Sequence, residues 1–392
     1  MFRRVFLDNS STTPIDESVL EEMMPYLRED FGNASSIHHY GQVARSAVDR
    51  ARHRLAALIN SRPNEVVFTS GGTESNNLAI RGLAIENRRH GRHIVTTAIE
   101  HPAVKMVCED LESQGFEVNY LAVDAQGIVS ADAVKDAIRP DTILVSVMAA
   151  NNEIGTLQPI DEIGRIVREL RAGGQKIWFH TDAVQAVGKV PVDVNQIGCD
   201  LLSLSAHKIH GPKGVGALFV RRGTRLHTQN IGGRQERGLR AGTEPVALVV
   251  GLGAAAESAA GSLSISSSRL GGLRDRLESV VGEMIPDIEF NGDRERRLPN
   301  ISNISFNGVE GEGLLINLDM RGIAVSTGSA CSSGTLEPSP VIRALGKGDA
   351  IARSAIRFSL GRQNSSDDIE RLLAALPEAV EVLRRLGDAD PK

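Results

Sequence analysis

The sequence has 392 residues, which at about 150 residues per domain predicts two or three domains. Hydrophobic residues make up 41% of the chain and charged residues 24%, and these shares exclude a largely disordered, collagen-like or coiled-coil protein. The formal net charge is −5, whereas a domain built to hold nucleic acid phosphates is usually basic. This charge speaks against nucleic acid as the main ligand.

The sequence shows no signal for export or for a membrane. No run of about 18 apolar residues is present, so we expect no transmembrane helix. Residues 1–8 reach Asp8 before a long apolar region forms, which speaks against a secretory signal. Cys108, Cys199 and Cys331 are odd in number and lie far apart, so they predict no disulfide framework. We therefore expect a cytoplasmic protein in a reducing compartment.

Strand-like and helical segments alternate along the first part of the chain. The β-rich runs are 66–69, 93–97, 142–148, 176–181, 200–205 and 215–220. The helical runs between them are 42–59, 74–88, 102–114, 130–138 and 160–172. Near-continuous apolar strands that alternate with helices predict an α/β fold, with a mainly parallel sheet covered on both faces.

The pattern changes after about residue 243. Two helices are expected at 245–260 and 266–285, followed by strands at 300–306, 323–326 and 355–360 and helices at 311–321, 338–346 and 366–386. These elements predict a smaller α+β domain. The Ser-rich segment 262–268 is the best candidate for the domain boundary.

The segment 69–77, Thr-Ser-Gly-Gly-Thr-Glu-Ser-Asn-Asn, follows a strand and opens a helix. Gly71 and Gly72 allow a tight turn, and the free N–H groups at the helix start suit a phosphate. Thr73 adds a hydroxyl donor. The alternative is an ordinary helix cap formed by Thr73.

Two further residues follow strands of the same sheet. Asp182 ends an apolar strand, where it can pair with a protonated ring nitrogen of a cofactor; the alternative is a helix N-cap. Lys208 leaves a buried strand and enters a Gly/Pro loop, flanked by Ser205 and His207. A lysine that loses solvation there has a lowered pKa and becomes a nucleophile for carbonyl groups. The alternative is a surface lysine in a turn.

A phosphate cradle, an acid at a strand end and a lysine after a strand are the three features that pyridoxal phosphate needs. The sequence resembles the aminotransferase class V family, and within it the cysteine desulfurases of the NifS/IscS type. The resemblance covers nearly the whole chain and rests on the segments 8–13, 32–38, 71–77, 100–101, 151–155, 181–185, 205–208, 236–243, 327–331, 336–339 and 356–361.

The resemblance implies the fold type I of pyridoxal phosphate-dependent transferases. In this fold a mainly parallel seven-stranded sheet lies between helices. The implied large domain covers residues 15–260. The implied small α+β domain covers residues 1–14 and 261–392 and carries the catalytic cysteine loop.

The resemblance also implies a role for each candidate residue around the cofactor. Lys208 would bind the cofactor covalently and then shuttle protons. Asp182 would keep the pyridine nitrogen protonated, and Gln185 would hydrogen-bond the phenolic oxygen. The phosphate would be held by a set of small and polar residues: Gly72, Thr73, Ser205, His207 and, from a neighbouring subunit, Thr243.

The remaining implied roles concern the substrate. His101 would stack on the cofactor ring and exchange a proton with the substrate thiol; the alternative is a histidine that only caps the helix after Pro102. Asn152, which also belongs to the cofactor site, and Arg357 would orient the substrate carboxylate. The planar fork of an arginine matches a carboxylate.

Cys331 selects the reaction. It lies in a stretch of small polar residues, 326–335, which predicts an exposed, mobile loop. The thiolate, with an ordinary pKa of about 8.5, would attack the substrate sulfur. The alternative is an inert loop cysteine. Cys199 and Cys108 are predicted to be buried structural residues.

The implied activity is conversion of L-cysteine to L-alanine, with the sulfur held as a persulfide on Cys331. A homodimer and a sulfur-acceptor protein, such as an iron–sulfur scaffold, are the implied partners. The segment 232–234 and residues 10–11 depart from the family pattern, and the C-terminal segment used for scaffold docking is missing after residue 392, so the acceptor stays open.

Several other functions remain as alternatives. An aminotransferase and a selenocysteine lyase share the implied fold. A G-x-G-x-x-A pattern within 246–256 is the only support for a nicotinamide oxidoreductase, and its helical context is wrong for that motif. A catalytically dead sulfur-binding protein is disfavoured because every cofactor feature is present. We expect no metal site, since no zinc-binding motif is found.

Overall fold

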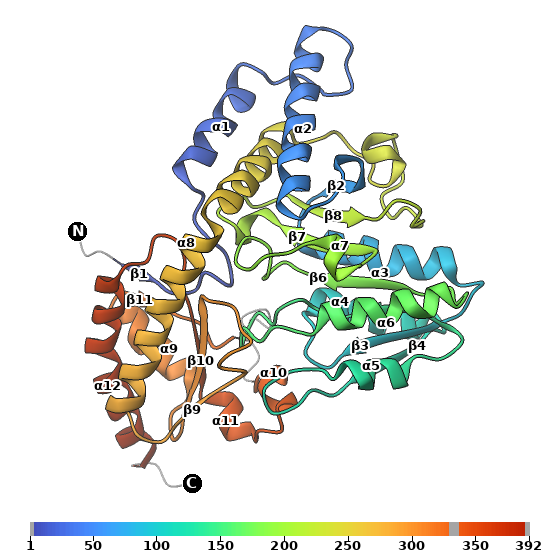
Figure 1. Cartoon of the computed structure of the whole chain (residues 1–392). Coiled ribbons are helices and arrows are strands. Elements are labelled where there is room, and N and C mark those ends of the chain that lie inside the picture. The colour runs from blue at the N-terminus through green and yellow to red at the C-terminus, as the bar shows by residue number, and fades with distance from the viewer. Residues whose placement is uncertain (1–3, 329–336, 389–392) are drawn as a thin grey trace.

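The computed structural model describes residues 4–328 and 337–388 (Figure 1). Its central feature is a seven-stranded sheet in the order β2-β8-β7-β6-β5-β3-β4. The strands are β2 (Val66–Thr69), β3 (His93–Thr97), β4 (Glu117–Leu121), β5 (Thr142–Ser146), β6 (Trp178–Asp182), β7 (Leu201–Ser205) and β8 (Gly216–Val220). Only β8 is antiparallel to its neighbours β2 and β7, and the other pairs are parallel. The predicted fold class is confirmed.

Alternate residues of the sheet face two different helical layers. Val145 and Phe179 belong to the core shared with α2 (His39–Leu58), α6 (Ile160–Ala172) and α8 (Val246–Met284). Leu144 and Leu201 belong to the core shared with α3 (Gly72–Asn87) and α4 (Pro102–Ser113). Successive side chains of a strand point to opposite faces, so a strand covered on both sides is apolar throughout.

Shorter elements complete the sheet layers. They are α5 (Ala131–Ala137), α7 (Val194–Ile197) and three turns of 3₁₀ helix, η1 (Pro63–Glu65), η2 (Ala206–Lys208) and η3 (Gln235–Gly238). Above the sheet in Figure 1, α1 (Glu17–Arg28) lies beside α2 and the start of α8. The sequence analysis missed α1, β4 and α7.

The C-terminal elements form a second core at the lower left of Figure 1. A three-stranded antiparallel sheet has the order β12-β10-β9, and the first strand β1 pairs in parallel with β11. The bounds are β1 (Val5–Phe6), β9 (Ile288–Phe290), β10 (Ile301–Phe306), β11 (Ile323–Ala324), β12 (Ala355–Ser359), α9 (Gly311–Met320), α10 (Pro340–Ala344), α11 (Asp349–Arg353) and α12 (Ser366–Asp388). The chain start thus joins this core, while the domain limits 15–260, and 1–14 with 261–392, stay a prediction.

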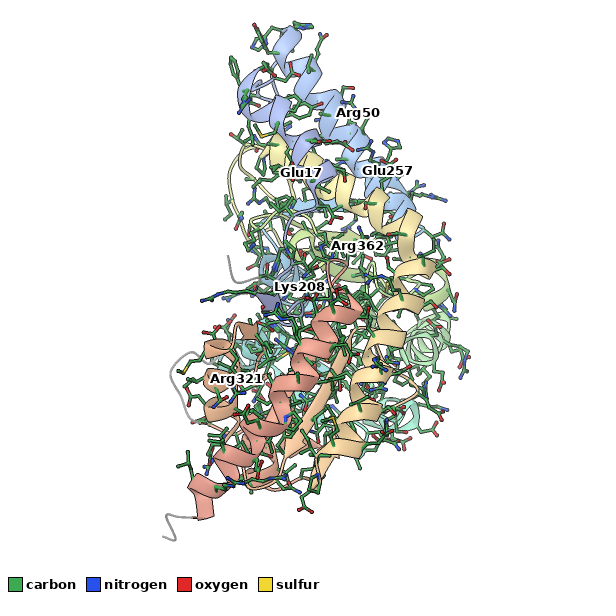
Figure 2. The ribbon with its side chains drawn as sticks, turned by 90° about the vertical axis from the view of Figure 1, so that its left-hand side faces the viewer. Glu17, Arg50, Lys208, Glu257, Arg321 and Arg362 are labelled. Carbon is green, nitrogen blue, oxygen red and sulfur yellow. The ribbon has the colours of Figure 1, made fainter. Side chains whose placement is uncertain are left out.

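The expectation of two helices at 245–260 and 266–285 is wrong. A single helix of 39 residues, α8, covers both segments, and the Ser-rich stretch 262–268 lies inside it. No proline interrupts residues 246–284, and serines in a helix cost only a few tenths of a kcal/mol each, about 0.5 relative to alanine. The first half of α8 packs on α1 and α2, and its last part packs on α12 (Figure 2).

Helix α8 has the length and apolar composition of a membrane-spanning helix, which the sequence analysis did not note. However, 56% of its most apolar stretch is buried inside the protein. It packs on α1, α2 and α12, so the larger part of this apolar stretch is covered by the protein itself. We interpret α8 as a core helix that joins the two hydrophobic cores.

Two glycines of α8 provide a test of this packing. A Cβ at Gly253 would lie 2.6 Å from Cα of Ala51 in α2, whereas a Cβ at Gly261 would meet nothing within 4 Å. We expect Gly253→Ala to lower the free energy of unfolding by about 1–3 kcal/mol, because backbone must move. Gly261→Ala should raise it by up to about 1 kcal/mol through helix propensity. Urea unfolding measures both, and equal effects of the two changes would contradict close packing of α2 on α8.

Candidate functional site

A cavity of about 350 Å³ lies at the carboxyl ends of β5, β6 and β7. Its lining includes all the predicted site residues except Thr243 and Cys331. The predicted residues that line it are Gly72, Thr73, His101, Asn152, Asp182, Gln185, Ser205, His207, Lys208 and Arg357. Thr243 is exposed and is not part of this lining. Cys331 lies outside the described residues, although Gly328, close before it in the chain, borders the cavity.

The sheet explains why residues far apart in sequence meet here. Asp182 is the last residue of β6, and Ser205 is the last residue of β7. Thr69 ends β2 and leads into the glycine turn before α3. Carboxyl ends of parallel strands meet at one edge, which is where open α/β sheets bind ligands.

The ammonium of Lys208 is held by main-chain oxygens of the N-terminal segment. Its Nζ donates to the carbonyl oxygens of Ser10, at 2.5 Å, and Ser11, at 2.6 Å. The same segment is fixed by a hydrogen bond from Ser10 N to Ser359 Oγ, at 2.8 Å. Figure 2 shows Lys208 between the upper part with α1 and α2 and the lower part with α12. Lys208 is therefore held by both parts of the chain, and the predicted alternative of a surface lysine is wrong.

Asp182 is 6% exposed and both its carboxylate oxygens accept hydrogen bonds. Oδ1 accepts from the backbone N–H of Val184 at 3.0 Å, and Oδ2 accepts from Nδ2 of Asn76 at 2.7 Å. The first of these bonds is the local cap that was the alternative interpretation of Asp182. The carboxylate nevertheless lines the cavity, so it both caps the turn and faces any bound group.

The turn before α3 forms a cradle of donors. Gly71 has φ 156° and ψ −176°, a conformation that favours glycine. A Cβ at Gly72 would lie 2.8 Å from Cγ2 of Val184, so a side chain would fill the space. A groove lies at this turn, lined by the start of α3 with its first N–H groups and by the residues Thr73 and Ser205, which carry hydroxyls. Lys213 borders the same groove. This set of donors at a helix N-terminus fits a phosphate.

His101 is the N-cap of α4 and also lines the cavity. Its Nδ1 accepts a hydrogen bond from the backbone N–H of Ala103 at 3.1 Å. The neutral ring therefore carries its proton on Nε2. Burial lowers the pKa of His101, the Asp182 carboxylate opposes this, and the Lys208 charge adds to it. His101 is therefore neutral at pH 7. Its position as the helix cap is confirmed, and its predicted role toward the cofactor and the substrate thiol stays a prediction.

The wall opposite the sheet comes from the C-terminal part. Arg357 in β12 donates from Nη2 to Oδ1 of Asp8 at 2.6 Å and from Nη1 to the carbonyl oxygen of Asn152 at 2.9 Å. Its Nε is buried and has no hydrogen-bond partner among the described residues. A permanently charged fork with donors to spare fits a carboxylate.

The two described cysteines lie away from the cavity, as expected. Cys108 and Cys199 are buried free thiols. Burial, with small effects of nearby charges, raises the pKa of each to about 12. Thiols in this state are inert as nucleophiles. The G-x-G-x-x-A pattern lies within α8 and follows no strand, which overturns the nicotinamide alternative.

Several residues around the cavity were not singled out from the sequence. Ser10 and Ser11 act through backbone carbonyls, which leave no side-chain signal. Asn76 is part of the quoted segment 69–77, and its Oδ1 is buried with no hydrogen-bond partner among the described residues. The complete set of groups, an acid, a lysine and a phosphate cradle on one cavity, fits pyridoxal phosphate.

Glu100, directly before His101, is a buried acid below the cavity. Its Oε1 accepts from Thr97 Oγ1 at 2.8 Å and from the backbone N–H of Met148 at 2.9 Å, while Oε2 has no hydrogen-bond partner in the described part of the chain. Burial raises its pKa from 4.5 to about 8, against the opposing effect of these two hydrogen bonds. Glu100 is therefore mostly protonated at pH 7.

This acid makes the stability of the protein depend on pH. The unfolded chain releases the Glu100 proton above pH 4.5, whereas the folded chain keeps it up to about pH 8. The free energy of unfolding therefore falls as the pH rises through this window, by up to about 1.4 kcal/mol per pH unit. We expect Glu100→Gln to remove this loss between pH 5 and 8, while Glu162→Gln on the surface of α6 should not. Urea unfolding at several pH values measures the free energy of unfolding of each protein. If this free energy changed with pH in the same way in the wild type and in Glu100→Gln, Glu100 would not be a buried neutral acid.

Comparisons with known proteins agree with this site. The family model described as aminotransferase class-V matches residues 5–372. A protein named cysteine desulfurase IscS from Methanosarcina thermophila is 50% identical over 391 residues, covering 100% of this chain and 95% of its own. The protein of the same name from Dictyoglomus turgidum is 49% identical and covers 99% and 97%.

Solved structures give the same result. A "NifS-like protein" superposes with a TM-score of 0.91 at 37% identity, covering 97% of this chain and 100% of its own. A structure titled "SspA in complex with cysteine" has a TM-score of 0.81 at 38% identity, covering 91% and 99%. The chain therefore belongs to the aminotransferase class-V family, and within it to the pyridoxal phosphate-dependent cysteine desulfurases of the IscS and NifS type.

Proposed function

We propose that this enzyme takes L-cysteine as substrate, releases L-alanine and keeps the sulfur as a persulfide on Cys331. The observation that carries the proposal is the single cavity that brings together Lys208, Asp182, His101 and Arg357, with Gly328 at its border. A lysine, an acid, a neutral imidazole and a carboxylate-binding fork are the groups that this reaction requires. The solved relative with bound cysteine supports the choice of substrate.

Pyridoxal phosphate, when bound, supplies an electron sink that makes the substrate Cα–H bond acidic. Asp182 would keep a proton on the ring nitrogen, and its two hydrogen bonds hold the carboxylate in place for this. Gly72, Thr73, Ser205 and His207 would hold the phosphate at the start of α3. Gln185 would donate to the phenolic oxygen. Each of these residues already lies on the cavity.

Lys208 and His101 move the protons. Lys208 would hold the cofactor through Nζ, and the same Nζ, once released, would take the proton from the substrate Cα. The same Nζ is positioned by two carbonyl oxygens, which accept and hold it when it is an ammonium. His101, which lines the cavity, would lie against the cofactor ring and would exchange a proton with the substrate thiol. Its Nδ1 is occupied by the N–H of Ala103, so Nε2 is the nitrogen that exchanges.

Arg357 and Asn152 orient the substrate carboxylate. Arg357 keeps its charge at every physiological pH, and its side chain is only 3% exposed. The carboxylate of Asp8 already balances part of this charge and fixes the plane of the guanidinium. The remaining N–H groups of Arg357 bind the carboxylate of the substrate. This contact places the substrate Cα beside Lys208.

Cys331 is the nucleophile in the sulfur transfer. Its thiolate attacks Sγ of the substrate, so one S–S bond forms and the C–S bond breaks. The electron pair of that bond stays with the carbon fragment, which takes protons and leaves as alanine. Gly328 borders the cavity, and Cys331 follows it by three residues in the sequence.

The later fate of the sulfur and the assembly are part of the same proposal. The outer persulfide sulfur passes to a thiol of an acceptor protein, for which an iron–sulfur scaffold is the candidate, and this takes place in the cytoplasm. The enzyme works as a homodimer. Thr243, exposed and away from the cavity of its own chain, reaches the phosphate of the partner.

The roles of Lys208 and Cys331 are tested by measuring alanine and sulfide from L-cysteine with a reductant. We expect Lys208→Ala to lower both rates at least about a hundredfold, because the proton transfer at Cα is lost. Cys331→Ala should lose both products while it keeps the yellow cofactor. The matched control, Cys199→Ala, replaces a buried thiol and should stay active.

Two results would count against the proposal. Full alanine production by Cys331→Ala would show that another group accepts the sulfur. A wild-type protein that holds its cofactor but makes no alanine from cysteine would move the substrate to selenocysteine or to an amino acid for transamination.

A further inference from the structure

Lys189 is a second lysine near Lys208, and the proposed reaction gives it no task. It ends the turn that follows β6, and its Nζ donates to Oε1 of Gln185 at 2.6 Å. Burial, together with the positive charges of Lys208 and Arg357, lowers the pKa of its ammonium to about 7. A buried ammonium is retained in a fold only where a hydrogen-bond partner compensates for the lost water. Gln185 is that partner.

The surroundings of Lys189 leave no room for a ligand of its own. It borders a second cavity of about 30 Å³, and Lys208 lines both this cavity and the main one. A space of this size holds about two water molecules. The titratable and charged groups around it are Lys208, His207, His210, Arg357, Arg362 and Asp16, the last of which pairs with both His210 and Arg362. The groups within reach of Lys189 are therefore those of the protein itself.

The hydrogen bonds of Gln185 define which way its carboxamide points. A lysine has three donors and no acceptor, so only the oxygen of the amide can face Lys189. The NH₂ group then points the other way, where one of its N–H groups donates to the carbonyl oxygen of Ser10 at 2.9 Å. The second N–H is left as the donor that Gln185 offers to the main cavity, which it lines. Without Lys189, only the carbonyl oxygen of Ser10, which also accepts from Lys208, is left to orient the amide.

We propose that Lys189 is a positioning residue, which fixes the carboxamide of Gln185 so that an N–H group faces the cofactor. This inference rests on the proposed role of Gln185 as a partner of the phenolic oxygen. An N–H donor stabilises a phenolate, whereas an amide oxygen in its place repels it. Lys189 thus acts through Gln185 on the charge of the cofactor, without touching it.

A double-mutant cycle tests the inference with the purified holoenzyme. The readout is the pH midpoint of the visible absorbance change of bound pyridoxal phosphate, recorded without substrate. Lys189→Met removes the donors and keeps the length of the side chain. We expect the midpoint to rise by about half to one unit, a three- to tenfold change in proton affinity, because a phenolate without its donor holds a neighbouring proton more tightly.

The same change is then made in a Gln185→Leu background. If Lys189 acts through the carboxamide, Lys189→Met should shift the midpoint there by less than about 0.2 units, because nothing is left to orient. Equal shifts in both backgrounds would show a direct effect of the lysine charge and would overturn the inference. The absence of a shift when Gln185 is kept would overturn it as well.

Three further variants complete the design. Lys189→Arg keeps donors and charge, so its midpoint should match that of the wild type. Lys189→Gln can both donate and accept, so it should shift the midpoint in the same direction as Lys189→Met but by less. It takes the place of Lys189→Met if that variant does not fold. Lys176→Met, at the exposed start of the β6 segment, is the surface control and should have no effect. A wild type that titrates as expected but makes no alanine would overturn the proposed function and leave this inference standing.

Discussion

The active site depends on the contact between the Lys208 ammonium and the carbonyl oxygens of Ser10 and Ser11. An ammonium taken out of water without acceptors costs several kcal/mol, at least about 2. The acceptors here come from the N-terminal segment, which contributes no strand to the large sheet. That segment is tied to the C-terminal core by the pairing of β1 with β11 and by the bond from Ser10 N to Ser359 Oγ. The lysine on the large sheet is therefore correctly solvated only when both cores are folded together.

The same segment organises the charges of the site. The carbonyl oxygen of Ser10 accepts from Lys208 and from Gln185, and Gln185 in turn accepts from Lys189. Two lysines are thus connected through one amide and one carbonyl oxygen. Arg357 adds a third cation, balanced in part by Asp8. This excess of positive charge in a mostly enclosed space suits a ligand that brings a phosphate, a phenolate and a carboxylate.

The elements that could be predicted from the sequence are those with one dominant signal. Strands β5 to β8 are almost wholly buried and each contains an apolar run, and their predicted bounds differ from the structure by at most two residues at either end. Strand β4 was missed because it lies at the sheet edge with Glu117 and Asn119 exposed, so its apolar pattern is weak. Helix α8 was divided in two because its serines resemble a linker, and the cores that hold it straight are distant in sequence.

The candidate site could be predicted to the extent that side chains carry it. Gly72, Asp182 and Lys208 stand in ordered motifs beside strands, and the sheet brings them together as expected. The carbonyl oxygens of Ser10 and Ser11 could not be found in this way, because any residue supplies a carbonyl. Glu100 and Lys189 depend on burial and on partners that only the folded chain defines.

The central claim is that Cys331 receives the sulfur in a cavity built around Lys208. Its most direct test is mass spectrometry of the peptides from the holoenzyme after a single turnover with L-cysteine, without a reductant. We expect one added sulfur atom on the peptide that contains Cys331, formed together with one alanine, and none on the peptides with the buried thiols Cys108 and Cys199. An added sulfur on either buried thiol, or alanine formed with no sulfur on Cys331, would contradict the claim.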